Sequence, residues 1–279
     1  MGVPLPVGLS PSSVSAFRDC PLAFRFAYVD RLPEPPSAPA SKGTLVHRAL
    51  ELLMCRAPGD RTLDAALADL DRARAEMADH PDLAGLELTD AEWAAFHADA
   101  ELLVRRYFEL EDPSTVRPIG LELKLTASLE RLTLRGIIDR LELDADGELV
   151  VTDYKTGTAP REGFEQDRMG GVHFYSLLCE RLLGRRPARV QLMYLSTPEV
   201  ISMVPSEQSV TAVERRAVAL WAAVERACER DDFRPRRGRL CDWCTFQPYC
   251  PAWGGDPARA VELLAAPAAA AQPLAATHP

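Results

Sequence analysis

Two aspartates and a lysine interrupt apolar, strand-like stretches of the chain. Asp139 lies in "GIIDRLEL", and Asp153 and Lys155 lie in "VVTDYKTG". Carboxylate oxygens are the ligands that Mg²⁺ and Mn²⁺ prefer, and these ions keep bound waters for chemistry. A lysine ammonium beside them can stabilise developing negative charge or orient an attacking water. The three residue types together favour metal-assisted hydrolysis.

The loop between the two strands determines whether the aspartates meet. Gly147 in "LDADGEL" favours a three-residue loop, residues 145–147, with the glycine in the left-handed region. Counting outward from that loop sets Asp139 opposite Asp153, with Cβ atoms about 5 Å apart. A two-residue Asp-Gly turn would instead place the two aspartates on opposite faces of the sheet. We prefer the first register, in which Lys155 shares the face.

Two like charges directly opposite each other destabilise a sheet unless something neutralises them. The rest of that face is leucine and valine, so a divalent metal is the simplest counterion. The alternative is a set of structural ion pairs, Asp139 with Arg140 or Arg135 and Asp153 with Lys155.

Helical and strand-like patterns surround these two strands. Helices are expected before Asp30 and over Thr44–Met54, Leu63–Ala78, Asp90–Leu110, Gln166–Leu183 and Glu207–Arg230. Strands are expected over Ile119–Ser128, Arg131–Leu143 and Glu148–Lys155, and in "RVQLMYL" and "VISMV". This order predicts an α/β fold with a central mixed β-sheet flanked by helices.

Composition limits the classes of protein to consider. The net charge of −9 excludes a chain coated in positive charge for nonspecific nucleic-acid binding, although a local basic groove remains compatible with it. Arginines number 29 and lysines only 3, so Lys155 suggests a specific need for a point-charge ammonium. With no apolar run long enough to span a bilayer and no signal-peptide pattern, we expect a cytoplasmic protein without membrane contact, whose thiols are reduced.

The segment "GIIDRLELDADGELVVTDYKTG" resembles the core of the PD-(D/E)xK nuclease superfamily, RecB branch, which carries G-x-x-D on one strand and D-x-K on the next. "KGTLVHRALE" resembles the G-x-x-x-H helix that precedes this core in the same branch. The resemblance covers the chain from about Leu9 to Trp253. It implies a restriction-endonuclease-like core.

The resemblance also implies roles for individual residues. His47, Asp139 and Asp153, with the Tyr154 carbonyl, would hold Mg²⁺ or Mn²⁺, and Lys155 would be the catalytic lysine. Glu122 in "GLELKL" stands where related proteins often place a further acid. For His47 alone, a packed helix histidine is the alternative. With Thr44 as N-cap, His47 would lie in the first helical turn, where the helix dipole disfavours a charged imidazole.

One motif departs from the family pattern. RecB-type nucleases place Gln four residues before a Tyr on the next helix, but here Gly171 precedes Tyr175, and Gln166 is off register. Through the resemblance we expect Tyr175 and Gln166 to contact nucleic acid, while Tyr175 is equally interpretable as a core aromatic. The glycine favours an alternative in which the protein binds DNA without cutting it.

Three cysteines lie within ten residues, in "CDWCTFQPYC". This spacing fits part of a zinc site or of an iron–sulfur site. The iron–sulfur members of the RecB branch, the AddB-like and CRISPR-associated nucleases, add one N-terminal cysteine. The resemblance therefore implies a 4Fe–4S cluster that joins the two ends of the chain, with zinc as the alternative. Its ligands would be Cys20, Cys241, Cys244 and Cys250. Trp243, Phe246 and Tyr249 would shield it. Cys55, Cys179 and Cys228 are interpreted as buried thiols.

The expected organisation is one nuclease domain over residues 1–255, with a helical insertion at about 58–112 and the cysteine cluster at 241–250. Residues 256–279 form an Ala/Pro-rich tail that we expect to be disordered. Arg236 and Arg237 beside the cysteines are candidate contacts to DNA phosphates, a solvated surface being the alternative.

The function implied is a metal-dependent exonuclease that hydrolyses phosphodiester bonds at single-stranded DNA ends in repair or recombination. A noncatalytic DNA-binding scaffold and a CRISPR adaptation nuclease are the alternatives, and the sequence names no helicase or repair partner.

Overall fold

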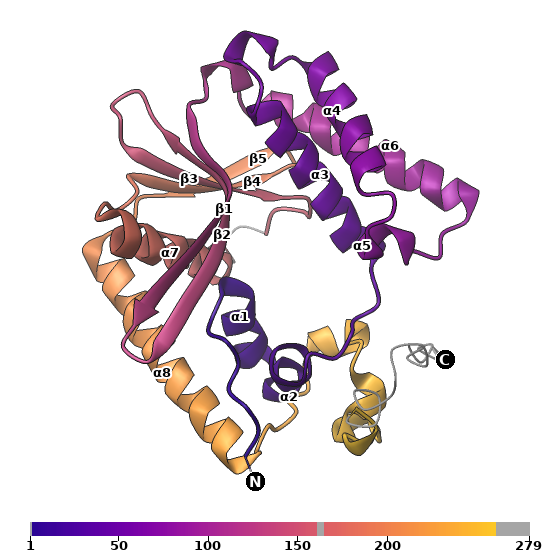
Figure 1. Ribbon diagram of the computed structural model, residues 1–279, viewed down its shortest axis with the longest axis vertical. Coiled ribbons are helices and arrows are strands. Elements are labelled where there is room, and N and C mark those ends of the chain that lie inside the picture. The colour runs from indigo at the N-terminus through magenta and orange to yellow at the C-terminus, as the bar shows by residue number, and fades with distance from the viewer. Residues whose placement is uncertain (1, 161–164, 261–279) are drawn as a thin grey trace. The chain divides into compact units, whose positions relative to one another are not determined.

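The computed structural model describes residues 2–160 and 165–260, and for residues 165–170 and 172 it describes the backbone alone. A five-stranded sheet in the order β1-β2-β3-β4-β5 lies at its centre (Figure 1). The strands are β1 (Pro118–Leu129), β2 (Leu132–Leu143), β3 (Leu149–Lys155), β4 (Arg189–Tyr194) and β5 (Glu199–Met203). The β2–β3 and β4–β5 pairs are antiparallel and β3–β4 is parallel, which confirms the predicted mixed sheet.

Helices precede, interrupt and follow the strands. They are α1 (Pro11–Asp19), α2 (Pro21–Phe24), α3 (Ala38–Met54), α4 (Leu63–Glu76), α5 (Pro81–Ala84), α6 (Asp90–Leu110), α7 (Glu165–Leu183) and α8 (Glu207–Arg230). The bounds of α6 and α8 are those predicted. Helix α6 begins with a capping box, in which Thr89 and Glu92 bond each other's backbone N–H groups, so its start is encoded locally.

The start of α3 corrects the prediction. The helix begins at Ala38, with Pro39 in its first turn, where proline has no hydrogen bond to lose. Thr44 is therefore an interior residue, and its hydroxyl donates to the Ala40 carbonyl at 3.2 Å. His47 lies well inside the helix, and the first-turn dipole argument does not apply to it.

Contacts divide the chain into two compact units. We call Pro36–Ala127 with Gly136–Val213 the sheet unit, and Met1–Pro35, Ser128–Arg135 and Glu214–Pro279 the terminal unit. In the sheet unit, α3, α4 and α6 pack side by side (Figure 1). Their shared core includes Leu50, Leu53, Val104 and Tyr107, each less than 1% exposed.

The terminal unit joins segments that are far apart in sequence. The Val3 N–H donates to the Cys228 carbonyl at 2.9 Å, and Arg25 pairs with Asp231. Phe26 packs against Phe246 and Tyr249, with ring centroids 5.5 and 6.0 Å away. The N- and C-terminal segments therefore share one small core.

No helix in the described part of the chain is both long and apolar enough to cross a membrane.

Candidate metal centre

The β2–β3 hairpin has the predicted register. Arg140 pairs with Thr152 and Leu143 with Leu149, and the Asp144 N–H donates to the Glu148 carbonyl at 3.0 Å. Gly147 adopts φ +78°, a backbone conformation that glycine tolerates without strain. The same register, continued by one pair, sets Asp139 beside Asp153. The three-residue loop is thereby confirmed.

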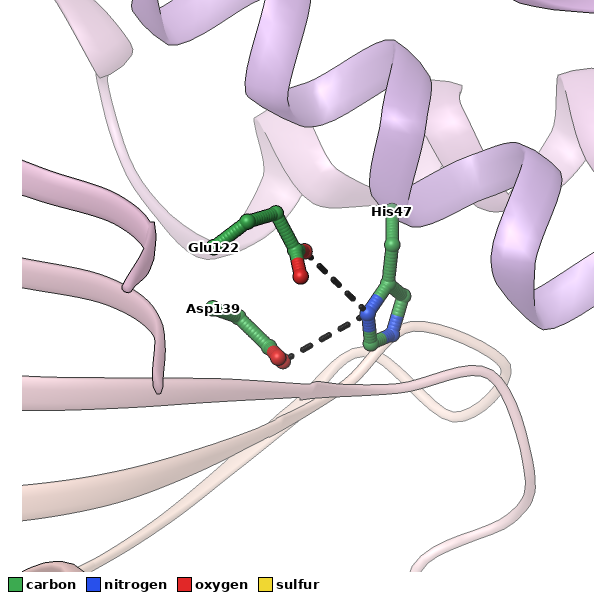
Figure 2. A group of neighbouring side chains, drawn as sticks. All are labelled: His47, Glu122 and Asp139. Atoms are coloured by element: carbon green, nitrogen blue, oxygen red, sulfur yellow. Dashed lines mark ion pairs between the residues drawn. The ribbon is translucent and has the colours of Figure 1, made fainter. Parts of the chain in front are cut away.

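Three side chains from three different elements converge near this hairpin: His47 from α3, Glu122 from β1 and Asp139 from β2 (Figure 2). One ligand atom of each lies within 4.8 Å of the others. His47 Nδ1 is 3.6 Å from Asp139 Oδ2 and 3.9 Å from Glu122 Oε1. An imidazole with two carboxylates is a donor set that suits a divalent ion.

The other imidazole nitrogen of His47 fixes the orientation of the ring. Nε2 lies 3.1 Å from the Tyr154 carbonyl, to which it donates when it carries the proton. In that tautomer the Nδ1 lone pair faces the two carboxylates, as in metal sites whose histidine is held by a backbone carbonyl. The Tyr154 carbonyl, expected from the resemblance as a metal ligand, lies within hydrogen-bonding distance of the imidazole. Burial lowers the pKa of His47, which favours the neutral imidazole that a metal requires.

The two carboxylates of this group are held at an electrostatic cost. Burial, and then the charge of Asp153, raise the pKa of Asp139 to about 8, although the Tyr154 N–H donates to its Oδ2 at 2.7 Å. Burial and the charge of Asp139 raise the pKa of Glu122 to about 7. A bound divalent ion would favour the ionised forms of both acids.

Glu122 also has an unusual backbone. Its φ is +43°, within a strand and at a residue that is not glycine. Such a conformation costs on the order of 1–3 kcal/mol and persists where the surroundings impose it, which happens most often at functional sites. This backbone conformation is a second unusual feature of Glu122, independent of its charge.

Asp153 and Lys155 form an ion pair next to this group. The Lys155 ammonium contacts Asp153 Oδ2, and the Tyr175 hydroxyl donates to Asp153 Oδ1 at 3.3 Å. Burial opposes the charge of Lys155, but Asp153 outweighs it and raises the pKa of the ammonium. The carboxylate of Asp153 thus takes the partner named in the ion-pair alternative, while its charge still acts on His47 and Asp139.

Two glycines allow the helices to approach these strands. A Cβ at Gly136 would lie 2.7 Å from Leu178 Cδ1 and 3.3 Å from the Tyr175 ring, so α7 packs directly on β2 there. A Cβ at Gly43 would lie 3.3 Å from the Thr156 hydroxyl, just beyond Lys155. Gly136 is the glycine of "GIIDRLEL" and Gly43 is the glycine of "KGTLVHRALE". Both allow close packing of a helix against a strand or its end.

A buried cation supports the centre from the opposite face of β2. The Arg140 side chain is fully buried and donates to the Tyr154 hydroxyl at 2.8 Å and to Glu111 Oε2 at 2.9 Å, and it pairs with Glu142 at 2.7 Å. Because Arg140 is committed to these acids, the alternative in which it neutralises Asp139 is wrong. Sequence reasoning missed this network, whose signal is a charged residue at an inward-facing strand position.

The remaining candidate DNA contacts are Gln166, Arg236 and Arg237. The Gln166 side chain lies outside the described residues. In the terminal unit, the Arg236 guanidinium donates to the Arg18 carbonyl, and the Arg237 guanidinium lies 5.2 Å from the centroid of the Trp253 ring.

All four predicted cluster cysteines belong to the terminal unit. Burial raises the pKa of the Cys244 thiol; the Phe246 N–H opposes this, and Cys20, Cys241 and Cys250 raise it further. The four sulfurs therefore lie close enough to influence one another. The backbone N–H groups of Arg236 and Gly238 donate to Cys20 and Cys241, each at 3.4 Å.

Two predictions about this region need correction. Phe246 and Tyr249 are buried, but Trp243 is 75% exposed and shields nothing. Cys179 and Cys228 are buried as predicted, whereas Cys55 is exposed, because it follows the last turn of α3.

A family model, a curated protein and a crystal structure are similar to this chain. The family model described as the PD-(D/E)XK nuclease superfamily matches residues 8–251. The Gene 69 protein of Mycobacterium phage D29 is 28% identical over 178 residues, which are 56% of this chain and 65% of the phage protein. This chain thus spans just under two thirds of that relative. A crystal structure of a candidate exonuclease from Eubacterium rectale has a similar fold, with a TM-score of 0.50 and 12% identity over 85% of this chain and 86% of the other.

Proposed function

The chain belongs to the PD-(D/E)XK nuclease superfamily, and from this premise we propose that it is a metal-dependent deoxyribonuclease that hydrolyses phosphodiester bonds at DNA ends. The observation that carries the proposal is the convergence of His47, Glu122 and Asp139, with ligand atoms within 4.8 Å of one another. Asp153 and Lys155 stand beside them. A structural role alone does not account for two acids with raised pKa values and a strained backbone at one of them.

The donor set fits Mg²⁺ or Mn²⁺. The imidazole lone pair of His47 and the carboxylates of Glu122 and Asp139 would hold the ion, and the charge of Asp153 would reinforce it. When bound, such an ion polarises a phosphate oxygen and lowers the pKa of a coordinated water.

The neighbouring residues would orient the metal ligands and add positive charge beside them. Tyr154 holds Asp139 through its N–H and lies beside His47 through its carbonyl. Lys155 places a positive charge where a phosphoryl group would become more negative, and Tyr175 orients Asp153 from the other side. Tyr175 supports the proposal in this way even though Gly171 replaces the expected glutamine.

We also propose that the substrate is single-stranded DNA, or DNA with single-stranded ends, and that the pathway is repair or recombination, as in the RecB branch. The motifs quoted for that branch support this. The glycine at position 171 supports the alternative of a DNA-binding protein without activity, which the experiment below distinguishes.

Four neighbouring cysteines, two of whose sulfurs accept from backbone N–H groups, fit a 4Fe–4S cluster. The spacing of the cysteine sulfurs supports an iron–sulfur cluster over zinc. Zinc–sulfur bonds of about 2.3 Å in a tetrahedron place sulfurs ~3.8 Å apart. Among the residues that the structure describes, the only group of three potential ligands within 4.8 Å is that of His47, so no three of the four cysteine sulfurs lie that close together. Visible absorption and iron content of the purified protein test the cluster directly.

The deciding experiment is Mn²⁺- or Mg²⁺-dependent digestion of end-labelled single-stranded DNA. We expect Asp139→Asn and Asp153→Ala to reduce cutting by at least about 100-fold. Glu101→Gln, which alters an exposed pair with Arg105 on α6, is the matched control and keeps full activity. An inert wild type that still binds DNA supports the noncatalytic alternative. Equal cutting by wild type and Asp139→Asn contradicts the proposed site.

A further inference from the structure

The segment that carries three of the cysteines also exposes large apolar side chains. In residues 234–253, Trp243 is 75% exposed, Leu240 63% and Trp253 49%. Soluble proteins rarely leave several such side chains of one short segment in water, and exposed apolar side chains of this kind often mark interaction surfaces. We call residues 234–253 the aromatic segment.

A contact within the segment holds the ring of Trp253 in place. Trp243 ends one short helical turn, Arg239–Trp243, and Trp253 ends another, Pro251–Trp253. The Trp253 N–H donates to the Cys250 carbonyl at 2.9 Å. The Arg237 guanidinium lies 5.2 Å from the centroid of the Trp253 ring and donates to the Ala252 carbonyl. A ring held in this way loses little entropy on binding.

The charge of the aromatic segment is opposite to that of the chain. It contains four arginines and one acid, Asp242, whereas the whole protein has a net charge of −9. The arginines are Arg234, Arg236, Arg237 and Arg239, and all four are exposed. Arg234 pairs with Asp232, and Arg236 donates to the Arg18 carbonyl, while both keep their solvent exposure. A local excess of positive charge on an acidic protein favours a negatively charged partner.

Exposed aromatic rings interleaved with arginines are the combination that recognises unpaired bases. The rings stack on bases and the guanidinium groups contact phosphates, whereas a duplex keeps its base faces inside. We infer that the aromatic segment binds single-stranded nucleic acid, with Trp243 and Trp253 stacking on unpaired bases. The choice of DNA as the ligand rests on the proposed function, but no residue of the segment belongs to the metal centre.

The test compares two ligands that share phosphates and differ in bases. Labelled oligothymidylate and an abasic oligomer of equal length are titrated with the full chain in EDTA, and fluorescence anisotropy gives the two dissociation constants. We expect Trp243→Ala and Trp253→Ala each to weaken oligothymidylate binding at least about fivefold and to leave abasic binding unchanged. Phenylalanine at either position restores part of the affinity.

Charge is tested separately from stacking. Arg239→Gln should weaken both ligands and reduce the slope of log K against log salt by about 0.7. Trp93→Phe, on α6 in the sheet unit, is the control and changes neither constant. Circular dichroism and visible absorption confirm that each variant is folded.

Two results overturn the inference: unchanged affinity in folded Trp243→Ala and Trp253→Ala, or equal affinity of wild type for the abasic oligomer. Failure of the proposed function looks different. If the tryptophans bind oligothymidylate but no metal supports cutting, the nuclease proposal fails and the inference stands.

Discussion

The surroundings of Asp139 shift its pKa in opposite directions. The Tyr154 N–H stabilises its ionised form, yet burial and the charge of Asp153 raise its pKa to about 8. Glu122 beside it has a pKa of about 7. Near neutral pH the metal-free centre therefore retains protons that an unfolded chain, with carboxyl pKa values of about 4, would release.

This proton retention predicts how stability depends on pH. Between pH ~4 and ~8 these two carboxyl groups bind more protons in the native state than in the unfolded state, so their contribution to the free energy of unfolding falls as pH rises. In EDTA we expect the melting temperature of the wild type to decrease from pH 5.5 to 8.5, and that of Asp139→Asn to decrease less. Thermal melts followed by circular dichroism measure both. Added Mn²⁺ should stabilise the wild type more at pH 8.5, because the ligands must lose their protons.

The difference between wild type and Asp139→Asn isolates the carboxyl from every other titrating group. Parallel pH profiles for the two proteins would show that Asp139 has an ordinary pKa and would remove the electrostatic argument for the site.

At this scale the sequence allowed much of the site to be predicted. Strand alternation and the turn preference of one glycine favoured the register that sets Asp139 beside Asp153, and the structure has that register. The positive φ of Glu122 and the contact of His47 with a carbonyl depend on how three elements meet, and neither leaves a local pattern.

Among the elements, β2 has charged side chains on both faces. Asp139 faces the candidate metal centre, and its neighbour Arg140 forms buried bonds to Glu111, Glu142 and Tyr154. Since Tyr154 contributes both backbone contacts to the centre, this network anchors the residue that positions His47 and Asp139.

Replacement of Arg140 by an apolar residue should destabilise the folded protein. Arg140→Met removes the cation that pairs with buried Glu142 and with half-buried Glu111, which keeps only the Tyr107 hydroxyl, and we expect it to lower the free energy of unfolding by about 3–5 kcal/mol. Urea titration measures the loss. Arg105→Ala, which breaks an exposed pair with Glu101 on α6, is the matched control and should cost under about 0.5 kcal/mol. Similar losses in the two variants would show that the Arg140 network is not a strong anchor.

Element boundaries were predictable where the signal is local and not where it is tertiary. The predicted start of α6 coincides with the capping box at Thr89, which is a local signal. The start of α3 was predicted too late because Pro39 and Gly43 are residue types that usually end helices. Here Pro39 occupies the first turn, and Gly43 lies where the helix approaches Thr156.

For the molecule as a whole, the terminal unit depends on segments from both ends of the sequence. Cys20 lies in it with Cys241, Cys244 and Cys250, and the pKa of Cys244 responds to the other three. A cluster bound by these residues would close a loop of more than 200 residues, which favours stability by restricting the unfolded chain.

We therefore expect Cys20→Ser to lower visible absorption and to reduce the free energy of unfolding by roughly 3–5 kcal/mol. Cys55→Ser, at an exposed thiol of the sheet unit, is the control and should change neither quantity. Absorption spectra and urea titrations of the three proteins provide the comparison. If Cys20→Ser matches the wild type in both, Cys20 is not a ligand.

The shared core of Phe26, Phe246 and Tyr249 has a consequence for biosynthesis. Phe26 leaves the ribosome early, but its aromatic partners are made more than 200 residues later. At 5–20 residues per second, that delay is roughly 10–45 s. During this time the nascent N-terminal segment has an apolar surface without its native cover, which is the kind of surface that chaperones bind.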